Sequence, residues 1–314
     1  MAGSHVTLPA LLDELQAAEE AGAEALGLWI ASCDDRRLRG GLRVIRARDQ
    51  AHARLARRRL AALGGGAIQS APRQVQSLCG VLAAADVSNR SKLTILLSRF
   101  PARADDALPD VVAALDDDET RALLEVVHDD DRASLRWLRE AGEEHPAGVP
   151  PGAALDVVGF LDAFRAAETA SADVFGAWRD VCVLPGLRGG LDTIAEREAT
   201  HAALLQERLT ELGGAMRMAV DPIVVADAIE RFGAPAESDE RKLGAVAARY
   251  SDDAAATSPV TRVLDTLADD AETQEMLRLI AAGEAATFAW LRSYHRAITA
   301  PPREVSLRVL DGGR

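Results

Sequence analysis

Two groups of carboxylate and imidazole side chains recur in this chain with the same spacing. The two groups are Glu19 with Asp49-x-x-His52, and Glu168 with Glu198-x-x-His201. Residues three apart on a helix lie on the same face, so each acid and the histidine after it can point toward one ligand. Carboxylate and imidazole donors are typical ligands of divalent transition metal ions. The spacing therefore predicts metal binding, provided that helices carry these residues toward a common interior.

A further carboxylate in each half of the chain falls on an apolar helix face. Asp131 follows Leu124 by one heptad, and Glu284 follows Leu277 by the same interval. A buried carboxylate is costly unless a cation meets it, and the usual cation for several acids with a histidine is a metal ion. The predicted metal ligands are Glu19, Asp49, His52 and Asp131 in one half, and Glu168, Glu198, His201 and Glu284 in the other.

These residues are positioned by a segment that occurs twice. Residues 11–65 align without a gap on residues 160–214, with about 25 identities in 55 positions, and repetition at a domain-sized period indicates duplicated domains. The motif Arg-Gly-Gly-Leu stands at 39–42 and again at 188–191. We call the two halves the first and the second copy. The predicted domains are 1–142 and 155–300, with a Pro-rich linker at 143–154 and a tail at 301–314.

Apolar residues recur at helical spacing throughout both copies. In the first copy this predicts a helix over 8–34, a break at Arg-Gly-Gly, a helix ended by Gly64-Gly65-Gly66, short helices at 73–85 and 90–99, and a long pattern from Pro109 to about 141. The second copy repeats this with helices at 155–182, 189–212, 221–232 and 238–250, and a long one from Pro259. The predicted class is all-α, with two tandem four-helix bundles.

The placement of these acids resembles the ferritin-like superfamily, which includes rubrerythrins and related carboxylate-bridged di-iron proteins. That family carries a Glu on one helix and Glu-x-x-His on the next, given twice per bundle. The resemblance implies bound iron or manganese, and oxidase or peroxide-reducing chemistry. Where the family has its second histidine, this chain has Ser134 and Thr287. The residues therefore predict one ion per site, held by three carboxylates and one histidine.

A second interpretation needs no metal. Arg59 and Arg208 stand at equivalent positions, each seven residues after the histidine of its copy and on the same helix face. Either guanidinium is able to neutralise an acidic cluster. The chain would then be a scaffold or partner-binding module that retains the fold without the ion. Whether the protein is an enzyme stays open at this point.

Composition excludes several classes of function. A net charge of -13 argues against a nucleic-acid binder, because phosphate contacts require a clustered positive surface. We find no apolar run long enough for a membrane span and no secretion signal, so we expect no membrane partner and a cytoplasmic location. The three cysteines make no disulfide framework. A homo-oligomer is compatible with these features, and the sequence names no small-molecule or protein partner.

The second helix of each copy also suggests how the copies meet. Arg43 and Arg58 in the first copy correspond to Asp192 and Glu207 in the second. Sign inversion at equivalent positions is what a pseudo-twofold pairing of these two helices requires. We therefore expect the copies to pack through these faces, with Arg58 paired with Glu207.

Overall fold

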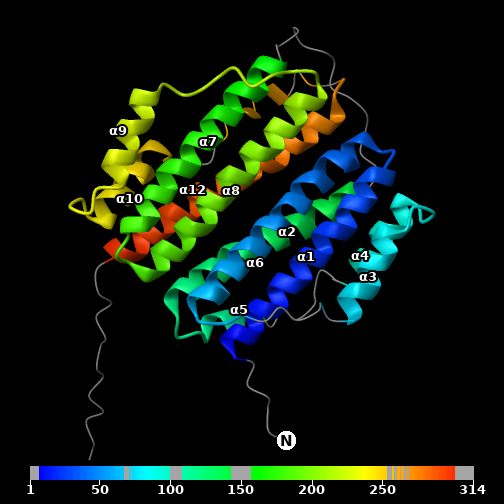
Figure 1. Cartoon of the computed structure of the whole chain (residues 1–314), viewed down its shortest axis with the longest axis horizontal. Helices are drawn as coiled ribbons and strands as arrows, with labels where there is room; N and C mark the ends of the chain where they lie inside the picture. The colour runs from blue at the N-terminus through cyan, green and yellow to red at the C-terminus, as the bar shows by residue number, and fades with distance from the viewer. Residues whose placement is uncertain are drawn as a thin grey trace, which may run out of the picture.

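The computed structural model describes residues 7–66, 71, 73–99, 108–142, 157–252, 257, 260–261, 263–264, 267 and 269–300. The described residues form helices and no strand, which confirms the all-α class (Figure 1). The first copy contains α1 (Leu8–Ser32), α2 (Arg36–Ala62), α3 (Arg73–Ala83), α4 (Asn89–Arg99), α5 (Leu108–Ala113) and α6 (Asp118–Gly142). The second contains α7 (Val157–Val181), α8 (Pro185–Glu211), α9 (Pro222–Phe232), α10 (Asp239–Arg249) and α12 (Ala271–Thr299). The predicted linker and tail lie outside the described residues.

The two copies repeat each other helix by helix. α1 and α7 are each 25 residues long, and α2 and α8 are each 27 residues long. α1 packs against α2, and α7 packs against α8, as two long antiparallel hairpins. α2 and α8 also contact each other, so the hairpins lie side by side through their second helices.

The break between α1 and α2 lies earlier than the glycine pair suggests. α1 ends at Ser32, and the side chain of Asp35 caps α2 by accepting a hydrogen bond from the Leu38 backbone at 3.0 Å. The second copy uses Pro185 in the first turn of α8 instead. The prediction that Arg-Gly-Gly ends a helix is therefore wrong, because both motifs lie inside α2 and α8.

The two glycines of each motif allow other helices to approach closely. A Cβ atom at Gly40 would overlap the backbone carbonyl of Glu272 on α12, and one at Gly189 would overlap that of Glu119 on α6. The second glycine makes room for a tryptophan of its own copy. Gly41 lies against Trp137, and Gly190 lies against Trp290. Each motif therefore contacts two long helices: the first glycine packs against the long helix of the other copy, and the second glycine packs against that of its own copy.

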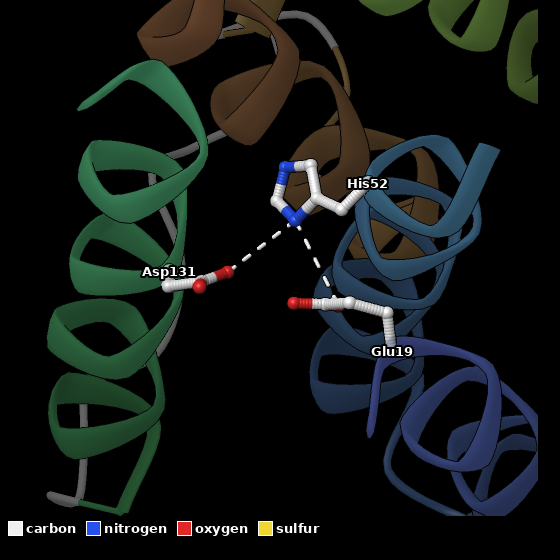
Figure 2. A group of neighbouring side chains, drawn as sticks. All are labelled: Glu19, His52 and Asp131. Atoms are coloured by element: carbon white, nitrogen blue, oxygen red, sulfur yellow. Dashed lines mark ion pairs between the residues drawn. The ribbon is translucent and has the colours of Figure 1, made fainter. Parts of the chain in front are cut away.

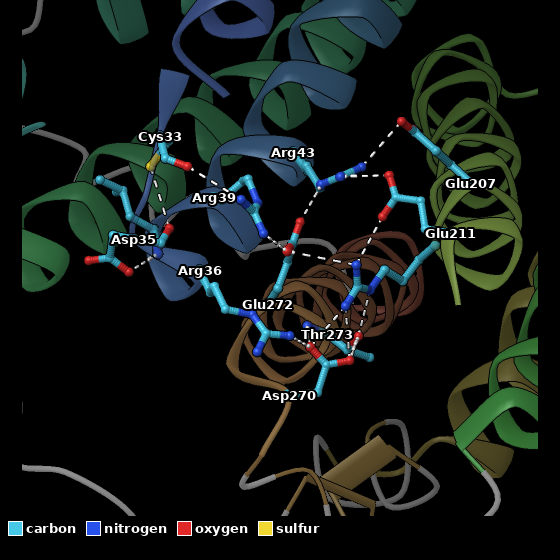
Figure 3. Close-up of polar contacts among 12 residues, drawn as sticks. Cys33, Asp35, Arg36, Arg39, Arg43, Glu207, Glu211, Asp270, Glu272 and Thr273 are labelled. Atoms are coloured by element: carbon cyan, nitrogen blue, oxygen red, sulfur yellow. Dashed lines mark hydrogen bonds and ion pairs between the residues drawn. The ribbon is translucent and has the colours of Figure 1, made fainter. Parts of the chain in front are cut away.

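The arginine of each motif also binds the long helix of the other copy. Arg39 donates to Glu272 at 2.5 Å, and Arg188 donates to Glu119 at 2.7 Å. Both glutamates lie in the first turn of a long helix, where a negative charge is favourable. Figure 3 shows Arg39 and Arg43 of α2 converging on Glu272 of α12. The first turn of each long helix is thus bound by an arginine of the other copy.

A seam of ion pairs joins α2 to α8. Arg43 pairs with Glu207 at 3.2 Å and with Glu211 at 2.6 Å at one end of the seam. Arg58 pairs with Asp192 at 3.3 Å, and with Glu196 at 2.6 Å, at the other end. The packing of the copies through these faces is confirmed. The expected pairing of Arg58 with Glu207 is wrong, because the two helices run antiparallel and bring Glu207 to Arg43.

The long helix of the first copy begins later than the sequence indicates. The pattern from Pro109 is divided into α5, which ends at Ala113, and α6, which begins at Asp118. In the second copy Pro259 lies outside the described residues, and the long helix α12 begins at Ala271 with Asp270 as its cap. Both long helices therefore start at an acidic first turn and not at a proline.

The apolar core extends across both copies. Its largest cluster of contacting buried side chains includes Trp29 and Leu42 from the first copy together with Leu205 and Leu277 from the second. α6 lies against α2 and α8, and α12 lies against the same two helices. The grouping of the helices into two four-helix bundles stays a prediction. Among the described helices, none has the length and apolarity needed to cross a lipid bilayer.

Candidate metal centre

The first cluster brings together side chains from α1, α2 and α6 (Figure 2). His52 Nδ1 lies 3.7 Å from Glu19 Oε2 and 3.5 Å from Asp131 Oδ1. Each of the three residues offers a ligand atom within 4.8 Å of the others. His52 is buried, whereas the Asp131 side chain is 39% exposed. One wall of this cluster is therefore open to solvent.

The second cluster is the equivalent group on α7, α8 and α12, and it is more enclosed. His201 Nδ1 lies 3.4 Å from Glu168 Oε2 and 3.1 Å from Glu284 Oε1. Here too the ligand atoms lie within 4.8 Å of one another, and all three residues are buried. The structure thus brings together three of the four predicted ligands in each copy.

The fourth predicted ligand of each copy lies beside its cluster. Glu198 is buried on α8 and shares a side-chain hydrogen bond with Glu168. Asp49 on α2 faces α1, where a Cβ atom at Gly22 would lie 2.8 Å from its Oδ2 atom. Asp49 and Glu198 therefore adjoin the groups whose ligand atoms converge, without belonging to them.

Four carboxyl groups at the clusters have raised pKa values, those of Glu19, Asp49, Glu168 and Glu198. Burial raises the pKa of Glu19 from its ordinary value of 4.5 to about 6, and the nearby charge of Asp131 adds to the rise. Burial also raises the pKa of Asp49 well above its ordinary value, with a further contribution from Glu19. The pKa values of Glu168 and Glu198 are raised well above the ordinary range by burial and by Glu284. A cation at each cluster would relieve this repulsion.

Several buried polar atoms of the clusters have no hydrogen-bond partner within the part of the chain that the structure describes. These atoms are His52 Nδ1, Glu168 Oε2, Glu198 Oε1 and His201 Nε2. Buried polar atoms without partners are rare in folded proteins and call for a specific explanation. A carboxylate oxygen left in this state is a donor available to a metal ion, and both such oxygens belong to the second copy. The nitrogen of His201 that faces Glu168 and Glu284 is Nδ1, on the other side of the ring from Nε2.

Sequence reasoning missed a buried ion pair between the clusters. Arg197 Nη2 donates to Asp130 Oδ2 at 2.7 Å, and its Nη1 donates to Thr287 Oγ1 at 2.6 Å. Arg48, the equivalent residue, donates to Ser134 Oγ at 3.2 Å. Both arginines are buried. An arginine stands at the same position in both copies, directly before Asp49 and Glu198. This repetition was the signal that could have revealed the two residues.

Ser134 and Thr287 thus have a definite role at the position where the resemblance leads one to expect a second histidine. Their hydroxyl groups accept hydrogen bonds from Arg48 and Arg197. His128, on α6, belongs to neither group of converging ligands among the described residues. The two hydroxyl groups therefore serve as hydrogen-bond acceptors for the buried arginines.

Asp130 makes the two clusters unequal. It contacts His52 Nε2 at 3.4 Å as well as Arg197. Burial would lower the pKa of His52, but the nearby carboxylates of Asp130, Asp131 and Glu19 raise it well above the ordinary value. In the second copy the equivalent position is Gly283, which faces His201 without a carboxylate. The first cluster accordingly favours a proton on His52.

Arg59 and Arg208 do not neutralise the clusters, which corrects the expectation for the metal-free interpretation. Arg59 binds Asp117 and Thr120 at the start of α6. Arg208 binds Asp270 and Thr273 at the start of α12. Seven residues are two turns of helix, about 10 Å, and this carries both guanidinium groups away from the histidines to the N-termini of the long helices.

No family model matches this chain, and no curated protein or solved structure shows significant similarity to it. The chemistry of the site is therefore inferred from its own geometry.

Proposed function

We propose that this protein binds a divalent transition metal ion, iron or manganese, at the cluster of Glu168, His201 and Glu284, with Glu198 beside it. The observation that carries the proposal is the convergence of three buried residues whose ligand atoms lie within 4.8 Å of one another, with oxygen atoms of Glu168 and Glu198 that lack hydrogen-bond partners among the described residues. Carboxylate and imidazole donors suit both metals. Within the described part of the chain, the ion pairs of Glu168 and Glu284 are with His201 alone.

The charges of the interior support a bound cation. Two guanidinium groups, those of Arg48 and Arg197, lie among seven carboxylates of the two clusters and their neighbours. The carboxylates are those of Glu19, Asp49, Asp130, Asp131, Glu168, Glu198 and Glu284. Ionised carboxylates without cations cost several kcal/mol each in a protein interior. Divalent ions would offset that cost, and iron or manganese would supply redox chemistry of the oxidase or peroxide-reducing kind.

The residues that hold the ion have distinct tasks. Glu168, Glu284 and His201 would bind it, and Glu198 would orient Glu168 through their shared hydrogen bond. Arg197 lies next to Glu198 in the chain and is fixed by Asp130 and Thr287, so its charge acts on the cluster from a constant position. This arrangement is consistent with a tandem ferritin-like fold in which one site is better formed than the other.

The metal-free interpretation has its own support at the first cluster. There Arg197 and His52 both meet Asp130, and the raised pKa of His52 places a second positive charge beside Glu19 and Asp131. These contacts compensate part of the acidic charge without an ion. We therefore propose that the second cluster binds metal more tightly than the first.

Metal content and calorimetry test the proposal. The purified protein is expected to contain about one equivalent of iron or manganese by mass spectrometry. Titration of the chelated protein with Mn²⁺ should show a site that is lost in His201→Ala, retained in His52→Ala and unaffected in the control His295→Ala. Absence of binding by the parent protein, or equal loss in the two cluster variants, would overturn the proposal.

A further inference from the structure

A hollow of about 380 Å³ opens beside the second cluster, where α7, α9, α10 and α12 meet. Figure 1 shows α9 and α10 together at the outer side of α7 and α12. Apolar side chains dominate its walls, among them Val174, Phe175, Val224, Phe232, Tyr250 and Phe288. A volume of this size lies in the range of about 300 to 1,000 Å³ typical of small-molecule sites.

The inner wall of this hollow continues the helix faces that carry the ligands. On α7, Ser171 and Phe175 follow Glu168 by one and two turns. On α12, Phe288 follows Glu284 by one turn. Residues three, four and seven apart share a helix face, so the hollow lies next to the acidic cluster. Phe175 and Phe288 are both buried and mark its inner end.

The outer end of the hollow is positively charged. Of the described residues that line it, the charged ones are Arg231 and Arg249, both exposed, in a chain whose acidic residues outnumber its basic ones by 49 to 36. Each guanidinium lies 5.6 Å from an aromatic ring centroid, that of Phe232 or Tyr250. Arginine at the mouth of an apolar site is suited to a carboxylate or another planar anion.

The first copy differs at the equivalent place. The turns that follow α3 and α9 match at an offset of 150 residues, since Ser88 and Lys92 correspond to Ser238 and Lys242. Arg231 of α9 therefore corresponds to Val81 of α3, an apolar residue that is partly buried. An exposed arginine at this position is a feature of the second copy.

We propose that this hollow binds a small organic anion with an apolar tail. The tail lies between Phe175 and Phe288, toward Glu168 and Glu284, and the acidic head lies at Arg231 and Arg249. The binding site depends on the hollow alone. The role of such a molecule as the substrate of the metal centre rests on the proposed function.

Calorimetric titration with decanoate tests the site in the full-length protein, both chelated and loaded with Mn²⁺. Saturable binding of about one equivalent is expected. Decanol, which has the tail without the charge, should bind about tenfold more weakly, a difference of about 1.4 kcal/mol. Decyltrimethylammonium and acetate should not bind measurably. Equal binding of the anionic and the cationic amphiphile would overturn the proposal.

Variants separate this site from general adsorption. Arg231→Gln with Arg249→Gln should weaken decanoate binding about tenfold, and Ala228→Trp should fill the hollow and abolish it. The control pair Arg217→Gln with Arg241→Gln removes two exposed charges from the same region without lining the hollow, and it should bind decanoate like the parent. Decanoate binding that is unchanged in the first two variants would overturn the proposal. Decanoate binding without any Mn²⁺ binding would overturn the proposed function alone.

Discussion

A single difference between the copies changes the charge beside the two acidic clusters. Asp130 on α6 binds Arg197 and contacts His52, whereas its counterpart on α12 is Gly283. Burial would raise the pKa of Asp130, but Arg197 and His52 hold it well below the ordinary value. The first cluster therefore has an aspartate that brings positive charge to it, and the second cluster lacks this aspartate.

Replacement of Asp130 tests this arrangement. Asp130→Asn leaves the buried guanidinium of Arg197 without its anion and should destabilise the protein by about 3 to 5 kcal/mol. The control Asp129→Asn, at an exposed neighbouring position, should change stability by less than about 0.5 kcal/mol. Urea unfolding followed by circular dichroism measures both. Adding Arg197→Met to Asp130→Asn should recover part of the loss, and a mild effect of Asp130→Asn would contradict this account.

The raised pKa of Glu19 predicts a pH dependence in the metal-free protein. Below pH 4.5 the carboxyl group is protonated in both the folded and the unfolded state, whereas between 4.5 and about 6 the folded state holds the proton more strongly. The contribution of this group to stability therefore falls as the pH rises through that window.

Glu19→Gln removes the penalty of ionising this carboxyl group. It should stabilise the chelated protein at pH 8 by roughly 2 kcal/mol, since one pKa unit corresponds to about 1.4 kcal/mol. It should have little effect at pH 4.5. Glu24→Gln, at an exposed position of α1, is the control. Thermal unfolding across this pH range provides the measurement, and destabilisation by Glu19→Gln at pH 8 would show that the carboxylate is already paired.

At the scale of the helices, the Arg-Gly-Gly motif sets how closely the long helices approach α2 and α8. Glycine in the interior of a helix is usually a cost of roughly 0.5 to 1 kcal/mol relative to alanine. Here the missing side chain permits contact with the backbone of a first turn, and the preceding arginine binds the glutamate of that turn. The motif therefore joins the copies.

Alanine substitution distinguishes the two kinds of helical glycine. Gly40→Ala places a Cβ atom against the Glu272 carbonyl and should destabilise the protein by about 1 to 3 kcal/mol through overpacking. Gly176→Ala on α7, where a Cβ atom would meet nothing within 4 Å, should be neutral or stabilising by up to about 1 kcal/mol. Denaturant midpoints compare them, and equal effects would refute the close approach.

At the scale of the whole molecule, α2 and α8 form the contact through which the copies are joined. The seam is antiparallel and pseudo-symmetric, because Arg43 with Glu207 and Asp192 with Arg58 are equivalent pairs with their signs exchanged. Exposed ion pairs contribute only about 0 to 1 kcal/mol each. Their main effect here is on register and orientation, while the shared apolar core supplies most of the stability.

Charge reversal at one end of the seam tests this pairing. Arg58→Glu should destabilise the protein by about 1 kcal/mol or less, since its side chain is 44% exposed. Adding Glu196→Arg should recover much of this loss, whereas Glu207→Arg should not, because Glu207 faces Arg43. Thermal melting of the single and double variants measures the coupling. Equal recovery by both second changes would contradict the antiparallel register.

The sequence by itself determined the helical class, the duplication and six of the residues that converge in the two clusters. Helical periodicity is local, so the inward position of Glu19, His52 and Asp131 could be read from their spacing to apolar neighbours. The positions at which helices end could not be read in the same way. The glycines of 39–41 resemble a helix end until the helix that packs on them is seen.

Only the tertiary structure decided what neutralises the acids and how the copies join. Arg48 and Arg197 looked like ordinary basic residues, and Arg59 looked better placed, until helix packing buried the first two and carried Arg59 to the N-terminus of α6. The contacts between the first turn of each long helix and the other copy join residues far apart in the chain, 233 positions for Arg39 with Glu272 and 69 for Arg188 with Glu119. Periodicity fixes which face of a helix is buried, but the partner of a buried charge is set by the neighbouring helix that reaches it.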